Sequence, residues 1–116
     1  MTAMSVKHTD KIDGMGIDEA ADTLVFLISD PYPWLIEELD HLRTFQKKIN
    51  NYYGYIQSKG YKAQYGDREF SSFRIEAVMK YQWTKNAEDF FYAGKRQLKE
   101  KGIEFTYTLA KEDNTP

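Results

Sequence analysis

Glu37 and His41 are the residues whose types and spacing come closest to a chemical motif. They stand four positions apart in a stretch with helical periodicity, so a carboxylate and an imidazole share one helix face, as two metal ligands can. No third ligand is visible beside them, and an acid–histidine pair of this spacing is also common on a solvated helix face. We therefore expect no metal site and no cofactor.

Any nucleophilic site would also have to centre on His41. The chain of 116 residues has two histidines and no cysteine, and the other histidine, His8, lies near the N-terminus. A nucleophile–base–acid arrangement needs a nucleophile beside the base, and nothing in the sequence places a serine there. The adjacent carboxylates at 37–38 and 88–89 fit helix starts, where the helix dipole favours negative charge. We expect no catalytic residue, and an enzyme or ligand site around His41 is only our third hypothesis.

Composition excludes several classes of partner. The formal net charge is −2, with 16 Lys and Arg against 18 Asp and Glu, whereas phosphate binding requires clustered basic residues. Gly14 and Gly16 do not suggest a phosphate loop, because a strand rather than a helix follows them.

The lack of cysteine fits a reducing compartment. No apolar run approaches the roughly 20 residues of a membrane span, and the first ten residues lack the apolar segment of a signal peptide. We expect a cytoplasmic protein that binds neither nucleic acid nor membrane.

The sequence predicts four β-strands in the fold that positions Glu37 and His41. The strongest pattern is the strict alternation over 73–83, which is typical of a strand with one buried and one solvated face. A second alternating run covers 103–109. The run 23–29 is apolar on both parities, as in a strand inside a sheet, and 11–18 is a short extended segment whose glycines favour an edge.

Two helices are expected between these strands. Apolar residues at steps of three and four predict the first helix over 34–58, with Gly60 as its C-terminal cap. Its predicted apolar stripe consists of Leu35, Leu39, Leu42, Phe45, Ile49, Tyr52, Tyr53 and Ile56. The second helix is expected to begin with Thr84 or Asn86 as its cap and to end at Gly102.

The order β-β-α-β-α-β predicts an α+β fold, a two-layer sandwich in which two helices cover one face of a four-stranded sheet. Residues 11–109 form the single domain, with 1–10 and 111–116 as flexible tails. The strand order in the sheet stays open.

The tyrosine-rich end of the first helix favours a contact surface for a protein partner. Tyr52 and Tyr53 fall inside the arc that a helix buries, whereas Tyr55 falls on the opposite side. Tyrosine is over-used at protein interfaces because it gives a large contact area at low entropic cost. The alternative is that a small domain uses tyrosine at the edge of its core. The expected partner-binding residues are Tyr55, Tyr61, Tyr65, Asp67, Glu69, Glu37, Glu38 and Asp40.

The stretches "IDGMGID", "LVFLISD", "HLRTFQKKINNYYGYI" and "GIEFTYTL", with a tryptophan at 34, resemble an uncharacterised family of short bacterial cytoplasmic proteins. The resemblance spans roughly 11–109 and implies the same β-β-α-β-α-β order. It transfers no catalytic residue. The matching positions are Asp30, Trp34, His41, Leu42, Lys48, Asn50 and Tyr53. Lys48 and Asn50 could bind a ligand or secure the neighbouring loop, and we favour the loop.

In size, acidity and surface style the chain also resembles immunity proteins, which are cytosolic inhibitors of a delivered toxin domain. Our first hypothesis is therefore a non-enzymatic inhibitor that binds a toxin, with aromatic anchors in a groove and carboxylates on the basic residues of a nuclease. A small homodimerising domain is the second hypothesis. The identity of the partner and the oligomeric state stay open.

Overall fold

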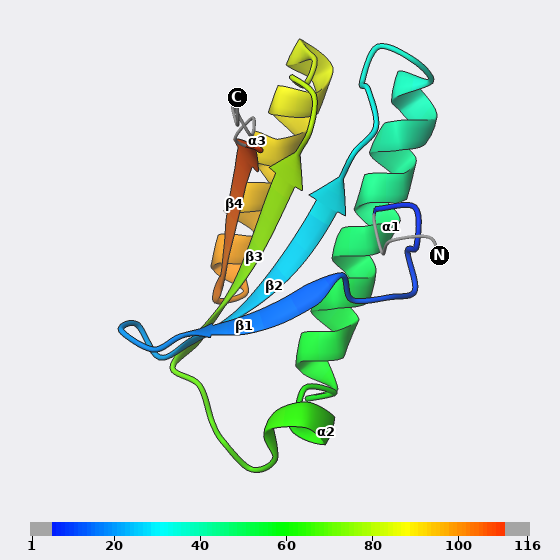
Figure 1. Ribbon diagram of the computed structural model, residues 1–116. Helices are drawn as coiled ribbons and strands as arrows, with labels where there is room; N and C mark the ends of the chain where they lie inside the picture. Colours follow the sequence, from blue (N-terminus) through cyan, green and yellow to red (C-terminus); the bar gives the residue numbers. More distant parts are fainter. Residues whose placement is uncertain (1–5, 111–116) are drawn as a thin grey trace, which may run out of the picture.

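The computed structural model describes residues 6–110 (Figure 1). The elements are β1 (Gly14–Asp18), β2 (Thr23–Asp30), α1 (Glu38–Gln57), α2 (Lys62–Tyr65), β3 (Ser72–Met79), α3 (Lys85–Glu100) and β4 (Ile103–Leu109). This confirms the α+β fold and the β-β-α-β-α-β order of the main elements. The short helix α2 is an addition, since the segment after α1 was expected to be a loop.

The strands form one mixed sheet in the order β1-β2-β3-β4. β1 pairs antiparallel with β2, whereas β2, β3 and β4 are parallel to one another. Figure 1 shows α1 and α3 on the same side of the sheet, as two layers require. The carboxyl ends of the three parallel strands therefore meet at one edge of the molecule, beside the start of α1 and the start of α3.

The core lies between the sheet and these two helices. One residue parity of each parallel strand faces the helices. The sealed side chains of Leu24, Phe26 and Ile28 on β2 point the same way as those of Ile75 and Ala77 on β3. Aromatic rings of the helices complete this layer. The open sheet face is charged: Arg74 Nε lies 2.6 Å from Glu104 and its Nη1 lies 3.3 Å from Asp18.

β3 is shorter than the alternating pattern predicted. It ends at Met79 rather than at 83, because both neighbouring strands end there: Met79 pairs with Asp30 of β2 and with Leu109 of β4. Beyond that point Tyr81 is exposed and Trp83 is half-buried against Phe91. The side-chain alternation continues past the last residue that has a partner strand.

The first helix begins four residues later than predicted. Trp34 is sealed in the core, and Glu37 then adopts a left-handed backbone conformation, with φ 53°, as the residue before α1. Leu35 and Leu39 consequently point away from the core and do not belong to the apolar stripe. The C-terminal cap is Ser58 rather than Gly60. Gly60 is required for close approach instead, because a Cβ there would lie 2.5 Å from the ring of Tyr55.

The second helix agrees with its predicted signals. The hydroxyl of Thr84 accepts a hydrogen bond from Ala87 N–H at 3.2 Å, and Gly102 follows the helix with φ 79°. None of the helices within 6–110 is long and apolar enough to cross a membrane.

Part of the predicted N-terminal tail packs on the domain. Val6 is sealed in the core, and its N–H donates to the carbonyl of Ser29 at 2.8 Å. Residues 1–5 and the predicted tail 111–116 lie outside the described residues. β1 begins at Gly14 rather than at 11, because Lys48 and Tyr52 bind the backbone just before it.

Candidate functional site

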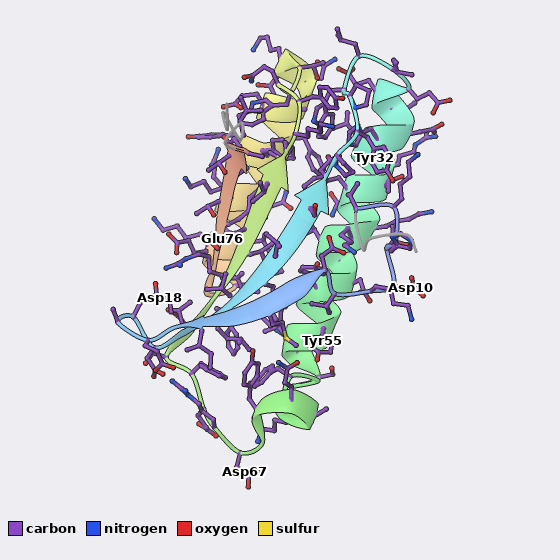
Figure 2. The ribbon with its side chains drawn as sticks, viewed as in Figure 1. Asp10, Asp18, Tyr32, Tyr55, Asp67 and Glu76 are labelled. Atoms are coloured by element: carbon purple, nitrogen blue, oxygen red, sulfur yellow. The ribbon has the colours of Figure 1, made fainter. Side chains whose placement is uncertain are left out.

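The partner surface predicted from the sequence is divided between the two ends of α1. This helix has 20 residues, which is about 30 Å at 1.5 Å per residue. Glu37, Glu38 and Asp40 lie at its start, whereas Tyr65, Asp67 and Glu69 follow its end. Figure 2 labels Tyr32 near the first end and Asp67 beyond the second. These residues do not form one continuous surface.

The tyrosines at the end of α1 mainly pack inward. Tyr61 is only 5% exposed and contacts Phe70 and Phe73, so its prediction as a partner contact is wrong. Tyr55 is half-buried with its ring edge-on to Phe26, because the helix end is covered by the chain that turns back at Gly60. Tyr65 is half-buried as well. The core role predicted for Tyr52 and Tyr53 is confirmed, since Tyr52 is sealed and Tyr53 half-buried.

Lys48 secures the segment that leads into β1. Its ammonium donates to the carbonyls of His8 and Lys11 at 2.6 Å each and to the Asp13 carboxylate at 2.7 Å, and the side chain has no solvent contact. Tyr52 extends this network by accepting from the Asp13 N–H at 2.9 Å and donating to the Leu27 carbonyl. Burial raises the pKa of the Tyr52 phenol. Lys48 therefore secures a loop, whereas Asn50 is exposed and bonds Gln46.

A second buried network lies where β2 ends. His41 Nε2 lies 2.6 Å from Asp30 Oδ2, and both side chains are almost fully buried. The imidazole stacks on the Trp34 indole, with ring centroids 3.6 Å apart and planes 5° from parallel. Asp30 Oδ1 accepts the Tyr32 N–H at 3.1 Å. His41 thus pairs with Asp30 and not with Glu37, which is the neighbour that the sequence spacing indicated.

Trp34 fixes the position of this pair. Its indole contacts His41, Phe45 and Phe91, which joins the loop after β2 to both long helices. Its Nε1 is buried without a hydrogen-bond partner within residues 6–110. An unsatisfied donor of this kind costs about 1–3 kcal/mol, and the packing of the ring on three aromatic neighbours offsets that cost.

A pocket of about 140 Å³ opens on the outer side of His41. Its lining includes Lys7, Tyr32, Ile36, Glu37, Asp40 and His41. The Lys7 ammonium lies over the Tyr32 ring, 4.1 Å from its centroid. Larger hollows of about 200 Å³ and 360 Å³ lie between α1 and α3 and where α3 ends beside β4, away from the buried pair.

Beside this pocket the surface is unusually apolar. Leu35, Ile36 and Leu39 are 88%, 66% and 59% exposed, and Glu37 and Asp40 stand between and after them in the chain. We call these five residues the docking ridge. Glu38 instead reaches α3, where hydrogen bonds from Thr84 and Asn86 lower its carboxyl pKa. The side chains of Glu37 and Asp40 form no ion pair with the rest of residues 6–110.

The site therefore differs from the predicted one in its composition. Glu37, Glu38 and Asp40 were predicted to contact a partner together, but Glu38 bonds Asn86 instead, and Leu35 and Leu39, predicted to lie in the core, are exposed. The sequence carries no local signal for this change, because Leu35 and Leu39 turn outward where Trp34 enters the core and Glu37 takes a left-handed conformation. Among residues 6–110, no group of three or more histidine or carboxylate side chains is arranged to hold a metal ion.

Comparison with known proteins identifies the family of this chain. No curated protein and no solved structure matches the chain. The model of one family of unknown function, DUF6572, matches residues 4–111, which include both buried networks and the docking ridge. The chain therefore belongs to the family of unknown function DUF6572.

Proposed function

We propose that this protein is a non-enzymatic inhibitor that acts in the cytoplasm by binding a basic toxin domain through its docking ridge. The observation that carries the proposal is the exposure of three aliphatic side chains, Leu35, Ile36 and Leu39, beside two carboxylates that form no ion pair within residues 6–110. Exposed apolar patches rimmed by polar residues are typical of protein-interaction sites.

The apolar part of the ridge would provide affinity. Fully burying one leucine or isoleucine side chain contributes about 1.5–3 kcal/mol relative to leaving it exposed. Leaving three such side chains in solvent stabilises nothing in the free protein. A partner that covers them gains this burial, against which the entropy lost on association must be set.

The carboxylates would select the partner. Glu37 and Asp40 are exposed at the start of α1 and lie beside the apolar side chains. Opposite charge on the partner accelerates association and disfavours wrong partners. A nuclease toxin presents basic residues for its substrate, so a ridge of this composition would block that surface by occupying it.

Binding should be tested with the products of the genes adjacent to this one, purified and titrated by calorimetry. The double variant Leu35→Ser/Leu39→Ser is expected to fold as the wild type does and to bind at least tenfold more weakly. It should also fail to protect cells that express the adjacent toxin. The matched control is Tyr92→Ser, since Tyr92 is also 59% exposed but lies on α3.

The two variants separate the possible outcomes. Loss of binding in the ridge variant with retention in the Tyr92 variant supports the proposal. Undiminished binding by the ridge variant would reject this surface. If none of the adjacent products is toxic or binds, the inhibitor function itself is rejected.

A further inference from the structure

The pocket beside His41 already contains one cation of this chain, held by few contacts. Lys7 follows Val6, whose backbone is anchored to β2, and its ammonium lies on the face of Tyr32. It forms no ion pair with another described residue. A cation–π contact at an exposed site contributes only about 0.5–1 kcal/mol. Lys7 is therefore held loosely enough to be displaced.

Three polar groups that form no hydrogen bond with another described residue line the same pocket. Two are the carboxylates of Glu37 and Asp40, for which residues 6–110 supply no donor. The third is His41 Nδ1. Nδ1 is an acceptor in the tautomer that carries its proton on Nε2, beside the Asp30 carboxylate.

His41 Nδ1 reaches the pocket rather than the core. The histidine is 8% exposed, and the hydrogen bond of its ring to Asp30 uses Nε2. Within the described chain the only sealed side-chain atom without a hydrogen-bond partner is Trp34 Nε1. Nδ1, which bonds no described residue, must therefore lie where the ring borders the pocket. A buried imidazole, fixed by Asp30 and Trp34, thus presents Nδ1 outward.

We infer that this pocket is a socket for a lysine or arginine side chain of the partner, which enters by displacing Lys7. Acceptors and an aromatic face, without a fixed cation, are what an ammonium or guanidinium group requires. The aliphatic lining, including Ile36, suits the methylene stem of such a side chain. The inference rests on the proposed function and specifies the partner residue that would anchor beside the docking ridge.

The size of the pocket supports a side chain rather than a cofactor. Small-molecule sites enclose about 300–1,000 Å³, whereas this pocket encloses about 140 Å³. Ile36, Glu37 and Asp40 belong to both the pocket and the docking ridge. A partner covering the ridge would therefore bring one of its basic side chains to the socket without a separate interface.

The socket can be tested without any partner. Nα-acetyl-lysine methylamide and Nα-acetyl-arginine methylamide are titrated into the labelled protein and followed by amide shifts in NMR. Nα-acetyl-norleucine methylamide, which has an apolar stem and no charge, is the matched neutral probe. At least one cationic probe is expected to give saturable shifts at Tyr32, His41 and Thr44, and the neutral probe none.

Variants then identify the contacts. Lys7→Ala is expected to tighten binding of the cationic probe about threefold, since it removes the internal competitor. Glu37→Gln/Asp40→Asn should weaken it about tenfold, whereas Asp67→Asn/Glu69→Gln, at the far end of α1, should leave it unchanged. Apart from Lys7→Ala, these substitutions replace exposed acids by their amides, so we expect each variant to keep the fold.

Failure of the socket is distinct from failure of the proposed function. Absence of saturable shifts with both cations, in the wild type and in Lys7→Ala, overturns the socket while leaving partner binding by the ridge intact. Equal binding of the neutral probe overturns it as well. Conversely, cation binding that survives the loss of all toxin binding would reject the inhibitor and retain the socket.

Discussion

At the residue scale, Lys48 shows how a charged side chain stabilises the core it enters. Among the described residues its ammonium donates to the carbonyls of His8 and Lys11 and to the Asp13 carboxylate, each within 2.7 Å. Removing one partner of a buried ion pair leaves the other charge uncompensated and typically costs about 3–5 kcal/mol. That cost is a large part of the 5–15 kcal/mol by which whole domains are stable.

We therefore expect Lys48→Met to lower the free energy of unfolding by about 3–5 kcal/mol, measured by urea denaturation. Lys47→Met is the matched control, because Lys47 is the exposed neighbour on the same helix. The control should change stability by less than about 0.5 kcal/mol. Adding Asp13→Asn to Lys48→Met should restore part of the loss. Equal effects at 47 and 48 would contradict the buried network.

Tyr52 predicts how stability changes at alkaline pH. Burial, the largest cause, raises the pKa of its phenol above the ordinary value of 10.0. The neutral phenol is then favoured in the folded state, so this stabilisation is present below pH 10 and is lost as the pH rises further. Ionisation of the unfolded tyrosine alone amounts to about 1.4 kcal/mol by pH 11.

Tyr52→Phe should lower stability at pH 8 by about 1–3 kcal/mol, because the Asp13 N–H and the Leu27 carbonyl lose their partner. Between pH 8 and pH 11 it should lose less stability than the wild type does, since the phenol is gone. Tyr92→Phe, at an exposed position, should keep the wild-type pH dependence. Denaturation midpoints at the two pH values measure both effects, and parallel curves for all three proteins would refute them.

At the element scale, the start of α1 determines which side chains of the docking ridge are exposed to solvent. Glu37 has a positive φ that glycine adopts more readily, at a saving of roughly 1 kcal/mol. Glu37→Gly is therefore expected to preserve or raise thermal stability. Glu38→Gly should instead lower it by about 1 kcal/mol or more, because it places glycine in the helix and removes the bond to Asn86. Calorimetric melting of both variants tests this, and equal losses would mean that position 37 is not left-handed.

The boundaries of the elements show how far the sequence alone can predict this fold. Local signals were sufficient where one segment determines its own structure, as in the Thr84 cap, the Gly102 stop and the buried parity of β3. They failed where a boundary depends on another segment. β3 ends because β2 and β4 end, and Leu35 faces solvent because Trp34 is taken into the core.

The candidate site was only partly predictable for the same reason. Spacing brought Glu37 and His41 together, but the actual partner of His41 is Asp30, eleven residues earlier on another element. Lys48 and Asp13 are 35 residues apart, and no local pattern connects them. Contacts of this kind depend on the sheet order and the packing of α1, neither of which the periodicity of one helix specifies.

At the scale of the whole molecule, the charge on the docking ridge bears on self-association. A two-fold dimer places the same patch of both copies face to face. Two docking ridges so arranged would bring Glu37 and Asp40 against the same carboxylates of the second copy. Like charges across an interface oppose binding, and salt screens that repulsion. The carboxylates that would attract a basic partner are therefore also expected to oppose contact between two copies of the ridge.

Sedimentation equilibrium at low salt is accordingly expected to give a mass near the 13.6 kDa of one chain. Glu37→Gln/Asp40→Asn, which leaves the three aliphatic side chains in place, should self-associate at concentrations where the wild type stays monomeric. Adding Leu35→Ser and Leu39→Ser to that variant should restore the monomer, because the apolar contact is then lost. A wild-type dimer at low salt that persists in Leu35→Ser/Leu39→Ser would place the self-contact elsewhere, on the open sheet face or along β4, and would favour the homodimer hypothesis over the inhibitor.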